Sequence, residues 1–266
     1  MISGVERLSS ADILKALRPL DLHPAQPVLA HASLRAFGRV DGGAEALLDA
    51  LLGAAPRLMM PTFTYKTMII PPHGPEGNGL RYGSGRESNR LAEFFRAELP
   101  ADRLMGAAAE TLRRRPGAQR SLHPILSFSG LGVEDLLSQQ TLQEPLAPIR
   151  ALAEQGGWVL LLGVDHSVNT SLHYAEVLAG RKQFIRWALT LSGIYACPNF
   201  PGCSQGFQEI EKYTGQIARS VRVGWTKVLA LPVQPLLRIA EALIRANPRA
   251  LLCRNPQCEL CACVPD

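Results

Sequence analysis

Short apolar runs alternate along this chain with segments of helical periodicity, and this alternation constrains the fold more than any other feature. The apolar runs predict strands at 27–31, 58–63, 125–128 and 158–163. The helical spacing predicts helices at 8–20, 44–52, 91–99, 170–179 and 234–246. Between them, residues 71–87 are rich in proline and glycine and are predicted to form a loop. Strands alternating with helices indicate an α/β sandwich built on one central sheet.

Composition is consistent with one folded domain over residues 1–266, because no segment has the composition of a linker. Hydrophobic residues make up 47% of the chain and charged residues 19%, enough for a sizeable packed core. No apolar run approaches the roughly 20 residues that span a bilayer. The first ten residues lack the apolar stretch of a secretory signal. We therefore expect a cytoplasmic protein without membrane contact.

The net charge of +5 raises the question of a nucleic-acid partner. The densest basic group is Arg113, Arg114, Arg115 and Arg120. Nucleic-acid modules usually place aromatic side chains among such charges, but none lies between 113 and 120. The cluster is expected to be either a solvated helix end or a contact to a phosphorylated ligand, and no nucleic-acid partner is expected.

All six cysteines lie after residue 196, so their chemistry belongs to the last part of the chain. The spacing Cys-x4-Cys-x2-Cys from Cys253 through Cys258 to Cys261 resembles half of a structural zinc site, and Cys197 or Cys203 can supply a fourth ligand. Free thiols in a loosely held tail and a disulfide are the alternative interpretations. We expect a cysteine-rich appendage over about residues 250–266. Its candidate zinc ligands are Cys203, Cys253, Cys258 and Cys261.

The segment 163–176 is the richest in chemistry, because it leaves a predicted strand and opens a predicted helix. His173 falls in the first helical turn, and Glu176 follows three residues later on the same face. An imidazole there can accept a proton at neutral pH, and free N–H groups at the helix start suit an oxyanion. The alternative is a structural His173 with all its bonds satisfied and a solvated Glu176.

Several common catalytic motifs are absent from the chain. It contains no GxxxxGK[ST] phosphate-binding loop, no HExxH zinc motif and no GxSxG around a serine nucleophile. Nucleotide hydrolysis, zinc proteolysis and serine hydrolysis are therefore not predicted.

Three long segments around the predicted turns form an ordered set of motifs. They read AHASLRAFGRVDGGAEALLDAL from Ala30, PGAQRSLHPILSFSGLG from Pro116 and GWVLLLGVDHSVNTSLHYAE from Gly157. Together they resemble the aminoglycoside 3-N-acetyltransferase family, over about residues 26–187. The resemblance implies a three-layer α/β/α sandwich around a central mixed sheet. It also implies direct transfer of an acetyl group from acetyl-CoA to an amine of an aminoglycoside or a similar small molecule.

The matching positions imply roles for individual residues. His173 would be the general base, and Glu176 would orient it or bind the substrate amine. Ser33 and Leu34 would line the path of the pantetheine arm, and Thr170 would lie beside the thioester. The residues expected along the CoA phosphates are Arg120, Ser121, His123 and Ser127.

Two other functions remain open at this point. One is a non-catalytic, zinc-stabilised binding protein on the same fold, and the other is an acetyltransferase for a metabolic amine that is not an antibiotic. An aminoglycoside is a polycation, so its pocket needs several carboxylates. Besides Glu176, the candidates are Asp165, Glu209 and Glu211.

Overall fold

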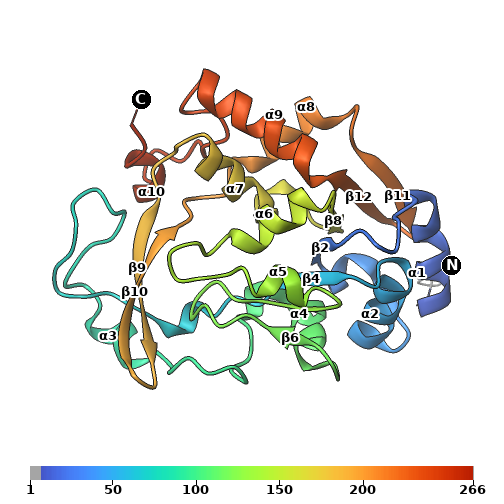
Figure 1. Ribbon diagram of the computed structural model, residues 1–266, viewed down its shortest axis with the longest axis horizontal. Helices are drawn as coiled ribbons and strands as arrows, with labels where there is room; N and C mark the ends of the chain where they lie inside the picture. Colours follow the sequence, from blue (N-terminus) through green and yellow to red (C-terminus); the bar gives the residue numbers. More distant parts are fainter. Residues whose placement is uncertain (1–6, 266) are drawn as a thin grey trace, which may run out of the picture.

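A seven-stranded mixed sheet forms the centre of the computed structural model, which describes residues 7–265 (Figure 1). Its strands lie in the order β11-β12-β8-β2-β4-β7-β6. Their bounds are β2 Val28–Ala32, β4 Leu58–Pro61, β6 Gln119–Arg120, β7 Phe128–Leu131, β8 Trp158–Leu162, β11 Arg219–Val223 and β12 Thr226–Pro232. Strand β2 pairs in parallel with β4 and β8, and the remaining pairings are antiparallel. The mixed sheet is therefore confirmed.

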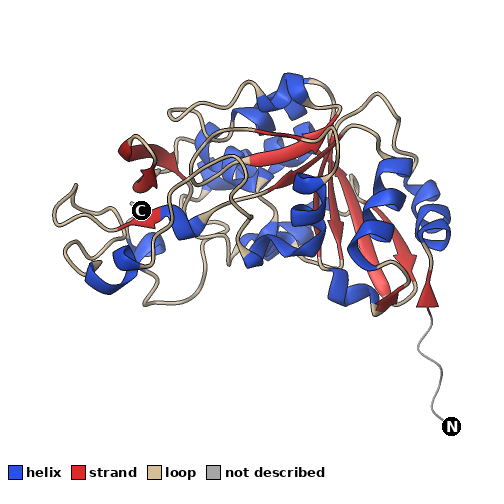
Figure 2. Ribbon diagram, turned by 90° about the horizontal axis from the view of Figure 1, so that it is seen from below, coloured by secondary structure: helices blue, strands red, loops and turns tan. Residues whose placement is uncertain are grey.

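Helices cover both faces of this sheet (Figure 2). One face packs against α1 Ser10–Leu17, α2 Gly43–Ala54 and α4 Gly106–Arg114. The other packs against α5 Glu134–Leu137, α6 Ala147–Glu154, α7 Ser171–Leu178 and α9 Val233–Ala246. In β8, Leu160 and Leu162 face the first layer while Val159 and Leu161 face the second, because successive side chains of a strand alternate. The three-layer sandwich is confirmed.

Local sequence explains why the predicted helices begin where they do. Ser9 and Asp12 form a capping box at α1, in which the Ser9 hydroxyl accepts from Asp12 N and Asp12 accepts from Ser9 N. Gly42 precedes α2 in the left-handed conformation, at φ 86°, which other residues rarely adopt. The predicted helices at 8–20, 44–52, 170–179 and 234–246 are confirmed. No helix among residues 7–265 is both long and apolar enough to cross a membrane.

A second, three-stranded sheet stands beside the central one, at the left of Figure 1. It consists of β5 Met68–Ile69, β9 Phe184–Thr190 and β10 Gly193–Phe200. A short parallel pair joins β1 Arg7–Leu8 to β3 Arg39–Val40. The remaining helices are short: α3 Arg86–Arg90, α8 Glu211–Thr214, α10 Glu259–Ala262, and the 3-10 turns η1 Arg18–Leu20, η2 Leu34–Phe37, η3 Tyr65–Thr67, η4 Arg103–Met105, η5 His166–Val168 and η6 Phe207–Ile210.

Two predicted elements are wrong. The helix predicted at 91–99 does not form, because the backbone N–H of Phe95 bonds Leu189 O on β9 and ties this segment to the second sheet. The strand predicted at 125–128 begins only at Phe128. The N–H groups of Ile125 and Leu126 donate to His123 Nδ1 instead of to a neighbouring strand.

The C-terminal tail is packed against the rest of the molecule. Leu251, Cys261 and Val264 are buried, and Leu251 belongs to the core on the α9 side of the sheet. A Cβ added at Gly206 would lie 2.2 Å from Leu252 O, so the tail backbone passes directly over the segment that follows β10. The alternative interpretation in which the tail is loosely held is therefore wrong.

Candidate active site

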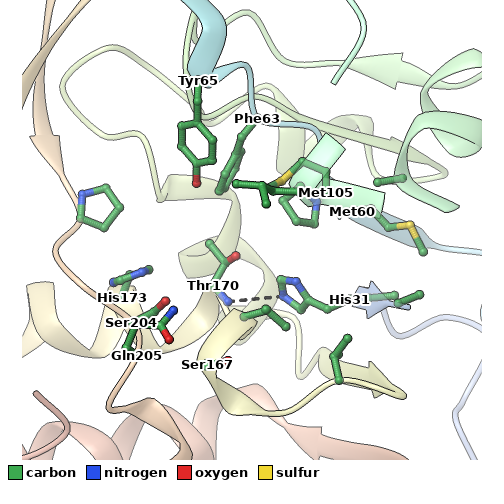
Figure 3. A pocket seen from close by; sticks show the side chains of 18 of the residues that line it. His31, Met60, Phe63, Tyr65, Met105, Ser167, Thr170, His173, Ser204 and Gln205 are labelled. Atoms are coloured by element: carbon green, nitrogen blue, oxygen red, sulfur yellow. Dashed lines mark hydrogen bonds between the residues drawn. The ribbon is translucent and has the colours of Figure 1, made fainter. Parts of the chain in front are cut away.

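A cavity of about 390 Å³ lies at the carboxyl ends of the parallel strands β2, β4 and β8 (Figure 3). This is the edge where open α/β sheets usually bind ligands. The start of α7 forms one part of its wall, and another is formed by Phe200, at the end of β10, with Pro201, Gly202, Ser204 and Gln205. Its polar lining side chains are His31, Tyr65, Ser167, Thr170, His173, Ser204 and Gln205. Two of the predicted site residues, Thr170 and His173, line this cavity.

His173 and Glu176 form a buried, hydrogen-bonded pair. The ring nitrogen Nδ1 of His173 lies 2.7 Å from Glu176 Oε2, as the spacing of three residues on α7 allows. Glu176 is only 1% exposed, so the alternative in which it is solvated is wrong. Phe207 packs on the imidazole, with 4.7 Å between ring centroids. With Nδ1 donating to the carboxylate, Nε2 is the nitrogen that can accept a proton from a ligand in the cavity.

Arg181 holds the second oxygen of the same carboxylate. Its guanidinium donates to Glu176 Oε1 at 2.7 Å, and to the carbonyls of Pro248 and Ala250 at 2.7 and 2.6 Å. A buried carboxylate requires such partners, and two fixed oxygens leave Glu176 no freedom to turn away from His173. Arg181 was not predicted as a site residue. Its only local signal is a basic residue just beyond the end of α7.

His31 is a second imidazole in the cavity and differs from His173 in having no carboxylate partner. Its Nε2 accepts a hydrogen bond from Thr170 N at 3.4 Å, the dashed line in Figure 3. Burial lowers the pKa of His31 to about 3, so the ring is neutral at neutral pH. It was not predicted as a site residue, although it lies near the end of β2 inside the first quoted motif.

The free N–H groups expected at the start of α7 are not free. Ser171 N donates to Asn169 Oδ1 at 3.2 Å, and Leu172 N and His173 N donate to the carbonyls of Asn169 and Thr170, also at 3.2 Å. This prediction was wrong because Asn169 and Thr170, the two residues between η5 and α7, supply the acceptors. The Thr170 N–H is also bonded, to His31 Nε2, and the Thr170 hydroxyl remains beside the cavity.

Arg120 does not reach the cavity. Its side chain donates to Ser127 Oγ and to the carbonyls of Thr62, Ala97 and Leu99. These contacts use four of the five guanidinium N–H groups. Burial lowers the pKa of Arg120 to about 10. Arg120 thus links the segments that contain Thr62, Ala97, Leu99 and Ser127. Its contact with CoA phosphates stays a prediction.

The other residues expected along CoA also lie outside the cavity wall. Ser121 and His123 bond the backbone of the turn that leads into β7, and burial lowers the pKa of His123 to about 4. Ser33 and Leu34 directly follow the cavity-lining Ala32. Their contacts with CoA, like that of Ser127, stay predictions.

The acidic residues considered for a polycationic substrate do not line this cavity either. Asp165 caps η5 through Ser167, and Glu209 and Glu211 pair with Lys212 and Lys227. Among the described residues that line the cavity, none is aspartate or glutamate. The Glu176 carboxylate lies behind the His173 ring.

Four cysteines gather next to the cavity wall, and we call them the cysteine cluster: Cys203, Cys253, Cys258 and Cys261. Their sulfur atoms all lie within 4.8 Å of one another. Cys203 follows β10 between cavity-lining residues, whereas the other three belong to the tail. Cys197 is buried in the core and is not part of this group. The structure therefore brings together the four cysteines chosen from the sequence.

Several solved structures share the fold of this chain. The YokD protein from Bacillus subtilis superimposes with a TM-score of 0.78 at 24% identity, over 91% of this chain and 95% of its own. The apoenzyme of the aminoglycoside acetyltransferase AAC(3)-IVa also gives 0.78, at 23% identity over 98% of both chains. Both likenesses establish the fold.

Sequence comparison establishes the family. The chain is 31% identical over 191 residues to aminoglycoside N(3)-acetyltransferase III from Salmonella sp. This match covers 68% of this chain and 65% of that protein. It is 33% identical over 175 residues to aminoglycoside N(3)-acetyltransferase VII from Streptomyces paromomycinus, covering 63% and 59%. The sequence profile described as aminoglycoside 3-N-acetyltransferase matches residues 29–245. This chain therefore belongs to the aminoglycoside 3-N-acetyltransferase family.

Proposed function

We propose that this protein is an N-acetyltransferase that moves the acetyl group of acetyl-CoA onto an amine of an aminoglycoside or a similar small molecule. The observation that carries the proposal is the His173 imidazole, which faces the cavity while Glu176 and Arg181 fix it from behind. Structures of the same fold include AAC-IIIb in a binary complex with CoASH and AAC-VIa bound to sisomicin. A cytoplasmic location, where acetyl-CoA is available, is part of the proposal.

The chemistry follows from one basic nitrogen. The substrate amine attacks the thioester carbonyl while His173 Nε2 removes a proton from the nitrogen, forming a C–N bond and an oxyanion. Collapse of this intermediate breaks the C–S bond, and the protonated imidazole gives its proton to the departing CoA sulfur. Glu176 keeps a proton on Nδ1 throughout, so in the neutral ring Nε2 carries the lone pair that accepts the proton of the amine.

The neighbouring residues have distinct tasks in this proposal. The Thr170 hydroxyl donates to the oxyanion, in place of the helix-start N–H groups, which are already bonded. His31 stays neutral because burial lowers its pKa to about 3, so it positions Thr170 and is not a base at neutral pH. The pantetheine arm enters past Ser33 and Leu34, the residues directly after the cavity-lining Ala32.

The cavity wall favours a second candidate substrate class, a metabolic amine with few charges. Its described lining is largely apolar, with Met60, Phe63, Met105 and Phe200, and contains no carboxylate. A polycation would lose hydration there without gaining a paired acid. Amines that carry a single ammonium group are the acceptors that fit this wall best.

The test follows thiol release from acetyl-CoA in the presence of aminoglycosides and of simple monoamines. We expect release with at least one amine, and we expect His173→Ala to lower kcat at least about 100-fold with little change in the Kd of CoA. The matched control is the exposed His73→Ala, which should keep wild-type turnover. A folded protein that neither releases thiol with any amine nor binds CoA in calorimetry would end the proposal and favour a non-catalytic binding protein.

A further inference from the structure

The cysteine cluster has the dimensions of a tetrahedral thiolate site. Zinc–sulfur bonds of about 2.3 Å place the sulfurs of a tetrahedron about 3.8 Å apart. The four sulfurs lie within 4.8 Å of one another, and those of Cys253 and Cys261 are 3.4 Å apart. A disulfide joins two sulfurs at about 2.05 Å and gives no reason for four to converge.

We propose that Cys203, Cys253, Cys258 and Cys261 bind one structural zinc ion. Four sulfur ligands complete the tetrahedral coordination of zinc and leave no open position for a substrate, so the ion would be structural and not catalytic. This proposal does not depend on the proposed acetyl transfer.

Backbone donors around the cluster support a bound cation with thiolate ligands. The backbone N–H of Gln205 forms a hydrogen bond with the Cys203 sulfur, and the backbone N–H of Cys261 forms one with the Cys258 sulfur. These N–H groups point at sulfur and would stabilise the thiolates that a metal requires.

The position of Cys203 connects this site with the cavity. Pro201, Gly202, Ser204 and Gln205 line the cavity on either side of Cys203. An ion held by Cys203 and by the tail would therefore fix the wall that faces His173. Loss of the ion is expected to loosen this wall. On the basis of the proposed acetyl transfer, which zinc binding itself does not require, this loss should raise the KM for the amine more than it lowers kcat.

The test measures metal in the full chain, purified without added metal, by elemental analysis and by zinc release when a mercurial blocks the thiols. We expect about one zinc per chain, as for other closed four-cysteine sites. Cys203→Ser and Cys261→Ser should lose it, whereas Cys263→Ser, a tail cysteine outside the cluster, should keep it. Less than about 0.2 zinc per chain in the wild type, iron in place of zinc, or full zinc in Cys203→Ser would overturn the proposal.

A second measurement covers the case in which the serine variants do not fold. Exchange of the wild-type protein with Co²⁺ should produce sulfur-to-cobalt charge transfer and the strong visible bands of a tetrahedral site. Thiol titration after chelation and denaturation should find all six cysteines reduced. Absence of the cobalt bands, or a shortfall of two thiols from a disulfide, would contradict zinc binding. Calorimetry with CoA on the same sample reports separately on the acetyltransferase proposal.

Discussion

His173 Nδ1 lies 2.7 Å from Glu176 Oε2, and this contact determines which nitrogen of the ring can act as a base. We predict that Glu176→Gln lowers kcat about 100-fold, because an amide neither holds the Nδ1 proton as strongly nor stabilises the imidazolium that forms. Steady-state thiol release measures the effect, and calorimetry should show the Kd of CoA within about threefold of wild type.

The control for that variant is Glu144→Gln, at an exposed carboxylate that pairs with Arg150 at 3.4 Å. It should leave kcat unchanged and alter the free energy of unfolding by less than about 1 kcal/mol. Wild-type turnover in a folded Glu176→Gln protein would show that the carboxylate has no part in the reaction.

Arg181 should matter for stability as well as for activity. Arg181→Met removes the cation beside Glu176 and leaves a buried carboxylate without its partner, so we expect a loss of about 3–5 kcal/mol in the free energy of unfolding. Urea denaturation measures this loss. Arg150→Met, at a partly exposed ion pair, should lose no more than about 1 kcal/mol. Equal losses in the two variants would contradict the role given to Arg181.

The free energy of unfolding should fall as the pH is lowered below about 6.5, the ordinary pKa of histidine. Burial lowers the pKa of His31 to about 3 and that of His123 to about 4 in the folded protein. The unfolded chain then binds more protons than the folded one between these pKa values and 6.5, so acid favours unfolding. Each histidine should cost about 2 kcal/mol between pH 6.5 and 5.

Urea denaturation at a series of pH values measures this dependence. His123→Asn keeps an acceptor for the N–H groups of Ile125 and Leu126 but does not titrate, so its slope should be smaller than that of the wild type. The exposed His73→Asn serves as the control and should reproduce the wild-type slope. Identical slopes in all three proteins would contradict the predicted contribution of His123.

Arg120→Met is predicted to destabilise the fold by about 3 kcal/mol, because the carbonyls of Thr62, Ala97 and Leu99 lose their donor. The same variant tests the CoA contact predicted from the sequence. A rise of more than about tenfold in the Kd of CoA, measured in a folded sample, would support that contact. Lower stability with an unchanged Kd would leave Arg120 a structural residue.

The parts of the fold that the sequence predicted are those set by local patterns. His173 and Glu176 are neighbours on one helix, so their spacing alone brings them together. The apolar run of β8 and the helical spacing of α1 are likewise local. The strand predicted at 125–128 failed because a buried side chain, His123, took its backbone donors, and no periodicity reveals that.

The parts that could not be predicted depend on contacts between distant segments. Arg181 meets the carbonyls of Pro248 and Ala250, and His31 meets Thr170 across 139 positions of the chain. The hairpin of β9 and β10 carries a buried arginine, Arg186, which weakens the apolar alternation of a strand. The cysteine cluster is the exception. The short spacing of Cys253, Cys258 and Cys261 indicated a metal site that needs a fourth ligand, and the distant Cys203 was one of the candidates for it.

The bonds from Arg181 to Pro248 and Ala250 have a consequence for how the protein matures during translation. The helix with His173 and Glu176 leaves the ribosome well before the carbonyls that anchor Arg181 have been synthesised. In a nascent chain that ends before residue 248, His173 and Glu176 are present, but Arg181 lacks the carbonyls that hold it against Glu176. Ribosomes that stall in this last stretch would release chains with most of the sandwich but no properly aligned base.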